Sequence, residues 1–139
     1  MSDLFGAMTI SAHGMRAQGE RIRVISENVA NSDTAPTNPN EEAYRRKTIT
    51  FKNVMDREND MKLVEVDKIS QDMKTEMPVK YLPDHPGADE NGYVQMPNIN
   101  TLIEIMDMKE AQRSYEANLG MMQQSRSMLS QTIDLLRSQ

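Results

Sequence analysis

Apolar side chains recur at seven-residue spacing near both ends of the chain. Within residues 2–31 they form one stripe, made of Leu4, Met8, Met15, Ile22, Ile25 and Val29. This spacing places them on one face of an amphipathic helix. Ser2 or Asp3 is a suitable N-cap, and Asn31 is a candidate for ending the helix in a left-handed conformation. The pattern therefore predicts a long N-terminal helix.

Residues 98–139 carry a second and longer repeat. One row is Met108, Tyr115, Met122, Leu129 and Leu136, and the row three residues earlier is Ile105, Gln112, Leu119, Arg126 and Ile133. Asn98 or Asn100 could cap this helix, or Thr101 and Glu104 could form a capping box. A helix of this length spans about 60 Å. Its stripe would extend past any core that the rest of the chain could build, which favours assembly over an ordinary monomer core.

The middle of the chain has a different pattern. A polar loop over residues 32–43 contains Pro36 and Pro39, and short strands are predicted at 48–51, 63–69, 79–82 and 93–96. The predicted fold is mainly α. Long N- and C-terminal helices pair as an antiparallel coiled-coil-like unit, with a small β-rich insert between them. We expect residues 1–31 and 98–139 to form a helical core domain and residues 32–97 to form the insert.

Composition narrows the possible functions. Only 37% of the residues are hydrophobic and 4% are aromatic, whereas thirteen are Met, which packs adaptably in helix seams. A net charge of −5 argues against nucleic acid as the principal partner. The absence of Cys excludes thiol chemistry, and the sequence contains no apolar run that predicts membrane insertion. No ordinary cleavable secretory signal is present, which indicates either a cytoplasmic protein or export that reads an uncleaved N-terminus.

Two groups of residues are candidates for chemistry. Asp84, His85, Asp89 and Glu90 could bind a divalent ion or act in a hydrolase, but their spacing fits a turn with solvated side chains better. His13 lacks a second ligand beside it. The basic run 44–47 could bind phosphates, lead into a strand, or pair with acidic residues of a neighbouring subunit. We therefore predict no catalytic site, no metal site and no cofactor.

Three segments resemble the bacterial flagellar axial proteins, the family that forms the rod and hook. Residues 26–34 are similar to the family's N-terminal signature, a helix ending in an Ala-Asn-x-x-Thr turn. Residues 81–100 resemble a segment typical of a proximal rod subtype, and residues 104–118 resemble the C-terminal rod-family helix. Many relatives follow the signature directly with a Pro-Gly-Tyr turn, whereas residues 35–42 intervene here, as expected of that subtype.

The resemblance implies a structural subunit with no enzymatic activity. Such proteins are exported unfolded through the flagellar type III apparatus without signal cleavage. They polymerise helically into a periplasm-spanning drive shaft in the basal body. The implied partners are copies of the chain, proximal and distal rod proteins, the MS-ring/rod junction protein and the export apparatus. A soluble coiled-coil adapter that dimerises through its C-terminal helix is the alternative.

The expected assembly interface combines both apolar stripes with the signature turn and the basic run, and Gln112 and Arg126 are candidates for setting its register. Its residues are Leu4, Met8, Met15, Ile22, Ile25, Asn28, Val29, Asn31, Thr34, Tyr44, Arg45, Arg46, Ile105, Met108, Gln112, Tyr115, Asn118, Leu119, Met122, Arg126, Leu129, Ile133 and Leu136.

Overall fold

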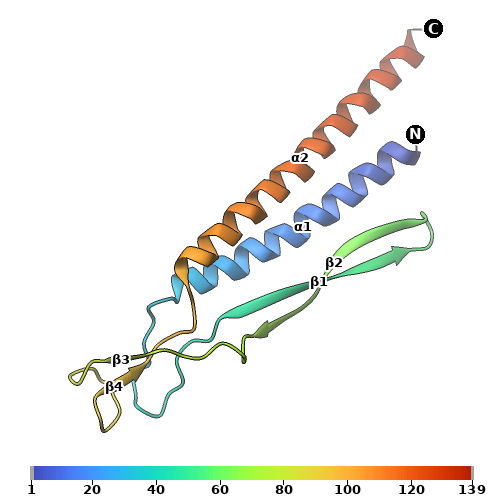
Figure 1. The fold of residues 1–139 in the computed structure, drawn as a ribbon. Coiled ribbons are helices and arrows are strands. Elements are labelled where there is room, and N and C mark those ends of the chain that lie inside the picture. Colours follow the sequence, from blue (N-terminus) through green and yellow to red (C-terminus); the bar gives the residue numbers. More distant parts are fainter. Residues whose placement is uncertain (1, 139) are drawn as a thin grey trace. The chain divides into compact units, whose positions relative to one another are not determined.

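The computed structural model describes residues 2–138 and contains two long helices and four strands (Figure 1). In chain order these are α1 (Ser2–Ala30), β1 (Lys47–Asp56), β2 (Met61–Gln71), β3 (Val79–Tyr81), β4 (Tyr93–Gln95) and α2 (Thr101–Arg137). The predicted pair of terminal helices with a small β insert is therefore confirmed. The coiled-coil character of their pairing stays a prediction.

Capping explains where the helices start and stop. The Asn100 side chain accepts hydrogen bonds from the backbone N–H groups of Leu102 and Ile103, so Asn100 is the N-cap of α2. The predicted left-handed end of α1 at Asn31 is wrong. The Asn31 N–H still donates to the carbonyl oxygens of Glu27 and Asn28, and Asp60 is the one non-glycine residue with positive φ among residues 2–138.

The strands form two separate two-stranded sheets. β1 pairs with β2 across the short turn that contains Asp60 (φ 52°). β3 and β4 are antiparallel, with Val79 opposite Gln95 and Tyr81 opposite Tyr93. β1 extends well beyond the predicted 48–51, because its second half, which ends at Asp56, continues the strand paired with β2.

The chain divides into two compact units. The first unit holds the described residues of Met1–Ile22, Thr50–Lys68 and Lys109–Gln139. The second holds Arg23–Ile49 and Ile69–Met108. Each unit therefore contains part of α1, part of α2 and part of the β1–β2 hairpin.

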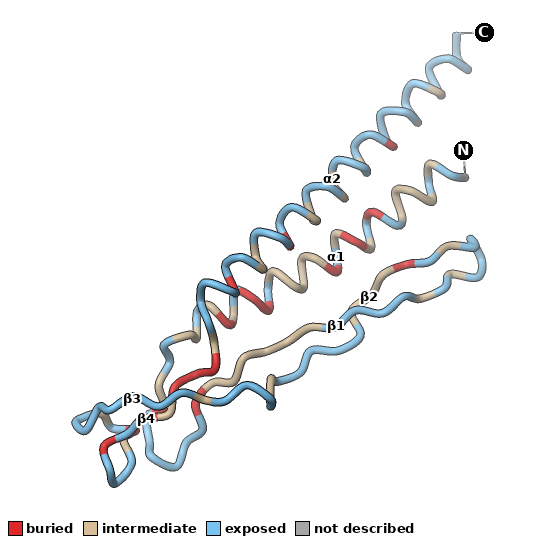
Figure 2. The backbone as a smooth tube through the Cα atoms, in the orientation of Figure 1, coloured by how far each residue is buried: buried red, intermediate tan, exposed pale blue. Residues whose placement is uncertain are grey.

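Small residues dominate the buried positions of the first unit. Ser11, Gly14 and Ala17 of α1 are buried, as are Ala111 and Ser125 of α2 (Figure 2). A Cβ atom placed on Gly14 would lie 2.8 Å from the Asn118 side chain, so the two helices approach closely at that point. Arg21 and Glu110 form an ion pair at 2.9 Å. Residues later in α1 thus meet residues earlier in α2, and the helix segments are antiparallel.

The β1–β2 hairpin packs on α1 within the same unit. Leu63 of β2 is buried, and the position of a Cβ on Gly6 would lie 3.0 Å from the Met61 sulfur. In Figure 1 the α1 segment lies between this hairpin and α2. Two-sided packing explains why α1 has more half-buried residues than the α2 segment beside it.

Candidate assembly site

A buried amide joins three segments of the second unit. Asn28, which is 1% exposed, accepts a hydrogen bond from the backbone N–H of Lys47 at 2.9 Å and donates to the Lys47 carbonyl at 2.8 Å. It also accepts from the Tyr44 hydroxyl at 3.1 Å and donates to the Glu104 carboxylate at 3.1 Å. One side chain therefore ties the end of α1 to the start of β1 and to the first turn of α2.

Glu104 is buried but paired. It is 1% exposed, and the Arg46 guanidinium donates to its second carboxylate oxygen. Arg46 also lies 4.0 Å from Asp72 and 3.8 Å from Asp107. A buried carboxylate is tolerated when both its charge and its hydrogen-bonding capacity are matched. The Glu104 side chain therefore bonds to Asn28 and Arg46, although the sequence suggested that it would cap the helix.

Asn98 adds a second amide to the same junction. Its oxygen accepts from the Arg46 backbone N–H at 2.8 Å, and its nitrogen donates to the carbonyls of Asp72 and Thr75, both at 3.1 Å. Hydrogen bonds from the Thr75 side chain and backbone, and from the Lys74 backbone, hold the pKa of the Asp72 carboxyl below its ordinary value. We call Asn28, Arg46, Asp72, Asn98 and Glu104 the polar junction.

The edge of the polar junction carries an ion pair and a tyrosine. Lys47 donates to Glu27 at 2.8 Å, which lowers the pKa of Glu27 and raises that of Lys47. Burial raises the pKa of Tyr44, so its hydroxyl stays protonated at neutral pH. The structure thus gives most of the basic run 44–47 acidic or amide partners within its own chain.

Several residues expected at subunit contacts therefore have intrachain partners. Besides Asn28, Tyr44 and Arg46, Arg45 pairs with Glu42 at 2.6 Å. Asn31 donates to the Glu27 carbonyl at 2.8 Å, and Thr34 is exposed. The expected role of these residues between subunits stays a prediction.

The apolar rows of α2 differ in burial. In the first predicted row Met108, Tyr115, Met122 and Leu129 are half-buried, whereas Leu136 is exposed. In the second row Ile105, Gln112, Arg126 and Ile133 are exposed and only Leu119 is half-buried. The more buried neighbouring row is Glu104, Ala111, Asn118 and Ser125. In the single chain the Met108 row is thus more covered than the Ile105 row, and the expected pairing of these residues with the N-terminal stripe stays a prediction.

The N-terminal stripe is less exposed. Ile25 is buried, and Leu4, Met8, Met15, Ile22 and Val29 are half-buried.

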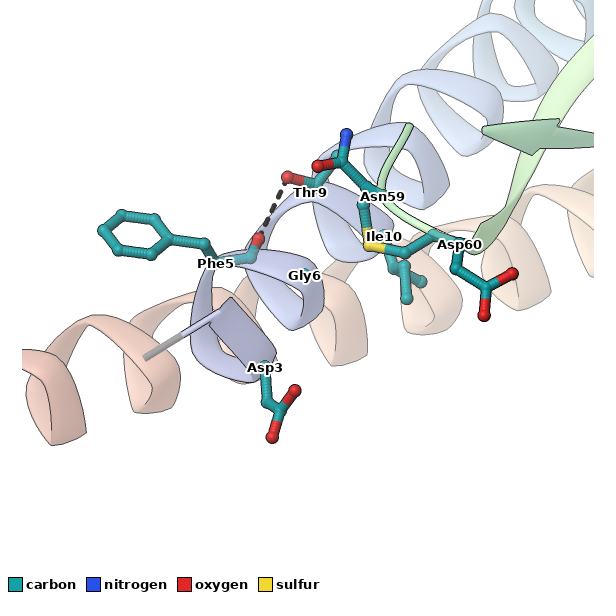
Figure 3. Close-up of a pocket in the computed structure, with 8 residues that line it drawn as sticks. Asp3, Phe5, Gly6, Thr9, Ile10, Asn59 and Asp60 are labelled. Atoms are coloured by element: carbon teal, nitrogen blue, oxygen red, sulfur yellow. Dashed lines mark hydrogen bonds between the residues drawn. The ribbon is translucent and has the colours of Figure 1, made fainter. Parts of the chain in front are cut away.

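An open hollow of about 550 Å³ lies near the start of α1, between its first turns and the β1–β2 turn (Figure 3). Asp3 and Phe5 leave the helix in different directions there, and the Thr9 hydroxyl donates to the Phe5 carbonyl at 2.9 Å. Asn59 and Asp60 line the other side.

The residues considered for metal or acid–base chemistry stabilise a turn. Asp89 accepts from the backbone N–H groups of Asn91 and Tyr93 at 2.9 and 2.8 Å. The His85 ring nitrogen Nδ1 accepts from the Gly87 N–H at 3.0 Å. Over residues 2–138, no three His, Asp or Glu side chains are grouped as a metal site would require. Neither α1 nor α2, as far as they are described, is long and apolar enough to span a membrane.

Comparison with known proteins connects these features to one family. Residues 90–135 match the family described as "Flagellar basal body rod FlgEFG protein C-terminal". The chain is 42% identical to the flagellar basal-body rod protein FlgC of Agrobacterium fabrum, and the alignment covers 99% of each chain. It is 34% identical to FlgC of Borreliella burgdorferi over 96% of this chain and 98% of the relative. For FlgC of Salmonella typhimurium the identity is 33%, over 95% and 97%. Agreement at this level along nearly the whole length shows that the chain belongs to the FlgC family of flagellar basal-body rod proteins.

Proposed function

We propose that the chain is a structural subunit of the proximal rod, that its copies assemble helically through their terminal helices, and that the assembly transmits torque across the periplasm. The observation that carries this proposal is the apolar end of α2. Leu135 and Leu136 are 69% and 63% exposed, and Ile133 beside them is exposed as well. Such large apolar side chains gathered over one helical turn favour contact with another protein.

The contacts within the first unit support the same reading. Gly14 meets Asn118, and Arg21 meets Glu110, so residue numbers in contact sum to about 132. By that register the start of α1 lies opposite residue 130 of α2, and within residues 2–138 no part of α1 lies beside the last turns of α2. A neighbouring subunit is the natural cover for these turns. Many such helix contacts, each modest in strength, would share the load of a rotating shaft.

The proposed partners follow from the family. They are copies of this chain, other proximal and distal rod proteins, the MS-ring/rod junction protein, and the flagellar type III export apparatus that would carry the chain without cleaving a signal. The relatives are named as basal-body rod proteins, which supports a place in the rod. The polar junction would hold the C-terminal end of α1 beside the N-terminal end of α2, and the apolar surfaces of both helices would remain available to neighbouring subunits.

Leu136→Asp tests the proposal, with Gln131→Asp as its matched control. Both residues are exposed on the final turns of α2, and both substitutions add one negative charge near the helix C-terminus. We expect Leu136→Asp to abolish swimming in soft agar and recovery of assembled rods, because a charge would be buried in the contact between subunits. Export of the variant should stay detectable, and Gln131→Asp should swim. Equal motility of the two variants would contradict the proposed contact between subunits at the end of α2.

A further inference from the structure

The negative charge of the chain is concentrated around β3 and β4. Residues 32–43 and 76–95 contain seven acidic side chains, Asp33, Glu41, Glu42, Glu76, Asp84, Asp89 and Glu90, against the single basic Lys80. Seven minus one gives −6 for these two segments, while the whole chain carries −5, so the remainder is +1. Even with Glu42 paired to Arg45, this region keeps an excess of negative charge, and its electrostatic field attracts cations.

The outward face of the β3–β4 sheet is apolar. Because side chains alternate along a strand, Val79 and Tyr81 share one face with their partners Gln95 and Tyr93. Val79 and Tyr81 are 62% and 63% exposed, and Tyr93 is exposed too. Val94 alternates to the opposite face and is fully buried. One face of this small sheet is thus core, and the other is open to solvent.

The two tyrosines are held in a defined arrangement. Their ring centroids lie 5.4 Å apart with an interplanar angle of 62°, an edge-to-face contact. Gly92, at φ 85°, lets the turn approach them, because a Cβ there would lie 2.9 Å from the Tyr81 ring. The aromatic surface is therefore fixed in place before any partner arrives.

A hollow of about 240 Å³ adjoins this face, between the loop containing Pro36 and Pro39 and the strands. Glu41 and Asp89 are among the residues that line it. Glu41 accepts hydrogen bonds from the Thr37 hydroxyl and N–H at 2.8 and 3.1 Å, which lower the pKa of its carboxyl. The Glu41 carboxylate is therefore charged at neutral pH, and hydrogen bonds from backbone N–H groups hold both the Glu41 and Asp89 side chains in position.

We propose that this surface, the β3–β4 face (Val79, Tyr81 and Tyr93 with Glu41 and Asp89), binds a segment of another protein that presents an Arg or Lys flanked by apolar side chains. A guanidinium or ammonium group stacks favourably on tyrosine rings and pairs with the carboxylates, while neighbouring apolar groups cover Val79. The acidic field repels nucleic acid and anionic lipid. The inference concerns a different surface from the end of α2 and goes beyond the proposed contact between subunits there.

The direct test is titration of the isotopically labelled full chain with a short peptide, acetyl-Leu-Arg-Pro-Leu-Arg-amide, followed by amide NMR. We expect shifts that saturate at submillimolar to millimolar peptide and map to residues 79–81, 93–95 and the loop around Glu41. The same peptide with Glu in place of Arg should cause none of them. Binding should weaken as salt is raised, because exposed charges are screened.

Charge variants sharpen the test without disturbing the fold. Glu41→Gln keeps a side-chain oxygen for Thr37 and removes the charge, so it should weaken peptide binding about two- to fivefold. Glu116→Gln is the matched control, since Glu116 is exposed on α2 in the first unit. It should leave affinity unchanged.

The inference would be overturned by equal binding of the Arg and Glu peptides, by shifts confined to residues outside the β3–β4 face, or by equal affinity of the two Gln variants. Shifts at the β3–β4 face that grow with chain concentration in the absence of peptide would identify a second copy as the occupant and would also contradict it. None of these outcomes bears on the Leu136→Asp experiment, so the two proposals fail separately.

Discussion

Asn28→Ala is the sharpest perturbation of the polar junction. It removes four hydrogen bonds at once, two to the Lys47 backbone and one each to Tyr44 and Glu104. A net hydrogen bond contributes about 1 kcal/mol, and a buried group left unpaired costs about 1–3 kcal/mol. Arg46 still pairs with Glu104, and the backbone of Lys47 is only partly buried, so part of this cost is offset by solvent. We therefore expect a loss of about 2–4 kcal/mol in the free energy of unfolding.

Urea unfolding of the full chain, followed by far-ultraviolet circular dichroism, measures that loss. With a slope of about 2 kcal/mol per molar urea, the midpoint should fall by about 1–2 M. Amide hydrogen exchange gives a local readout, since the Lys47 N–H donates directly to Asn28 and should lose protection. Asn31→Ala is the matched control. Asn31 is also an amide of the signature, and its nitrogen donates to one backbone carbonyl, so its loss should stay below about 1 kcal/mol.

Equal midpoints for Asn28→Ala and Asn31→Ala, or unchanged protection of the Lys47 amide, would refute this role of Asn28. Either result would mean that the start of β1 is held by its sheet partner alone. The signature asparagine would then be free to serve contacts between subunits, as the sequence first suggested.

Two further predictions concern a tight approach and the response to acid. Gly87→Ala should destabilise the chain by about 1–3 kcal/mol, because its Cβ would lie 2.1 Å from the Pro36 carbonyl oxygen. Gly120→Ala, where a Cβ meets nothing within 4 Å, should instead stabilise by up to about 1 kcal/mol. The order of their thermal midpoints tests this, and similar destabilisation by both would refute it. The folded-state pKa values of Glu27 and Asp72 are lowered, so their contribution is complete above the unfolded values and is lost on acidification. The melting temperature should therefore fall between about pH 5 and pH 3, and a flat profile there would contradict the assigned hydrogen bonds.

The elements of the fold were predictable because their signals are local. The apolar repeat, the alternating strand segments and the capping oxygen of Asn100 lie within a few residues of what they specify. These signals predicted both helices and all four strands described. The length of β1 was underestimated, since its second half mixes polar with apolar residues and depends on pairing with β2.

The inner row of α2 could not be predicted from apolar spacing. Ala111, Asn118 and Ser125 are small or polar, so a hydrophobic pattern passes over them and selects the neighbouring Ile105 row. What brings them inward is the facing surface, above all Gly14, whose missing side chain makes room for Asn118. The seven-residue spacing of these small residues does indicate a helix face, but whether that face is buried depends on the helix that packs against it.

The polar junction escaped prediction for a different reason. Arg46 and Glu104 are separated by 58 positions, and nothing in the sequence near either residue indicates the other. A basic run in an acidic chain is compatible with several partners, and the intrachain one was not among the interpretations that the pattern favoured. Burial of Glu104 is a property of the assembled fold, in which the Asn28 amide and the Arg46 guanidinium both donate to the Glu104 carboxylate.

The close contact between α1 and α2 in the first unit, where the buried residues are small, has a mechanical consequence. Gly14 and Ala111 have no side-chain rotamers to rearrange, and Gly14 lies directly against the short Asn118 side chain, so α1 and α2 approach closely there. Such a contact resists sliding more than a layer of long flexible side chains does, although it buries little apolar surface. Under the proposed function this helix contact would be weak but rigid. The two helices would separate readily before the subunit is incorporated. Once neighbouring subunits pack around them, they would resist sliding past each other.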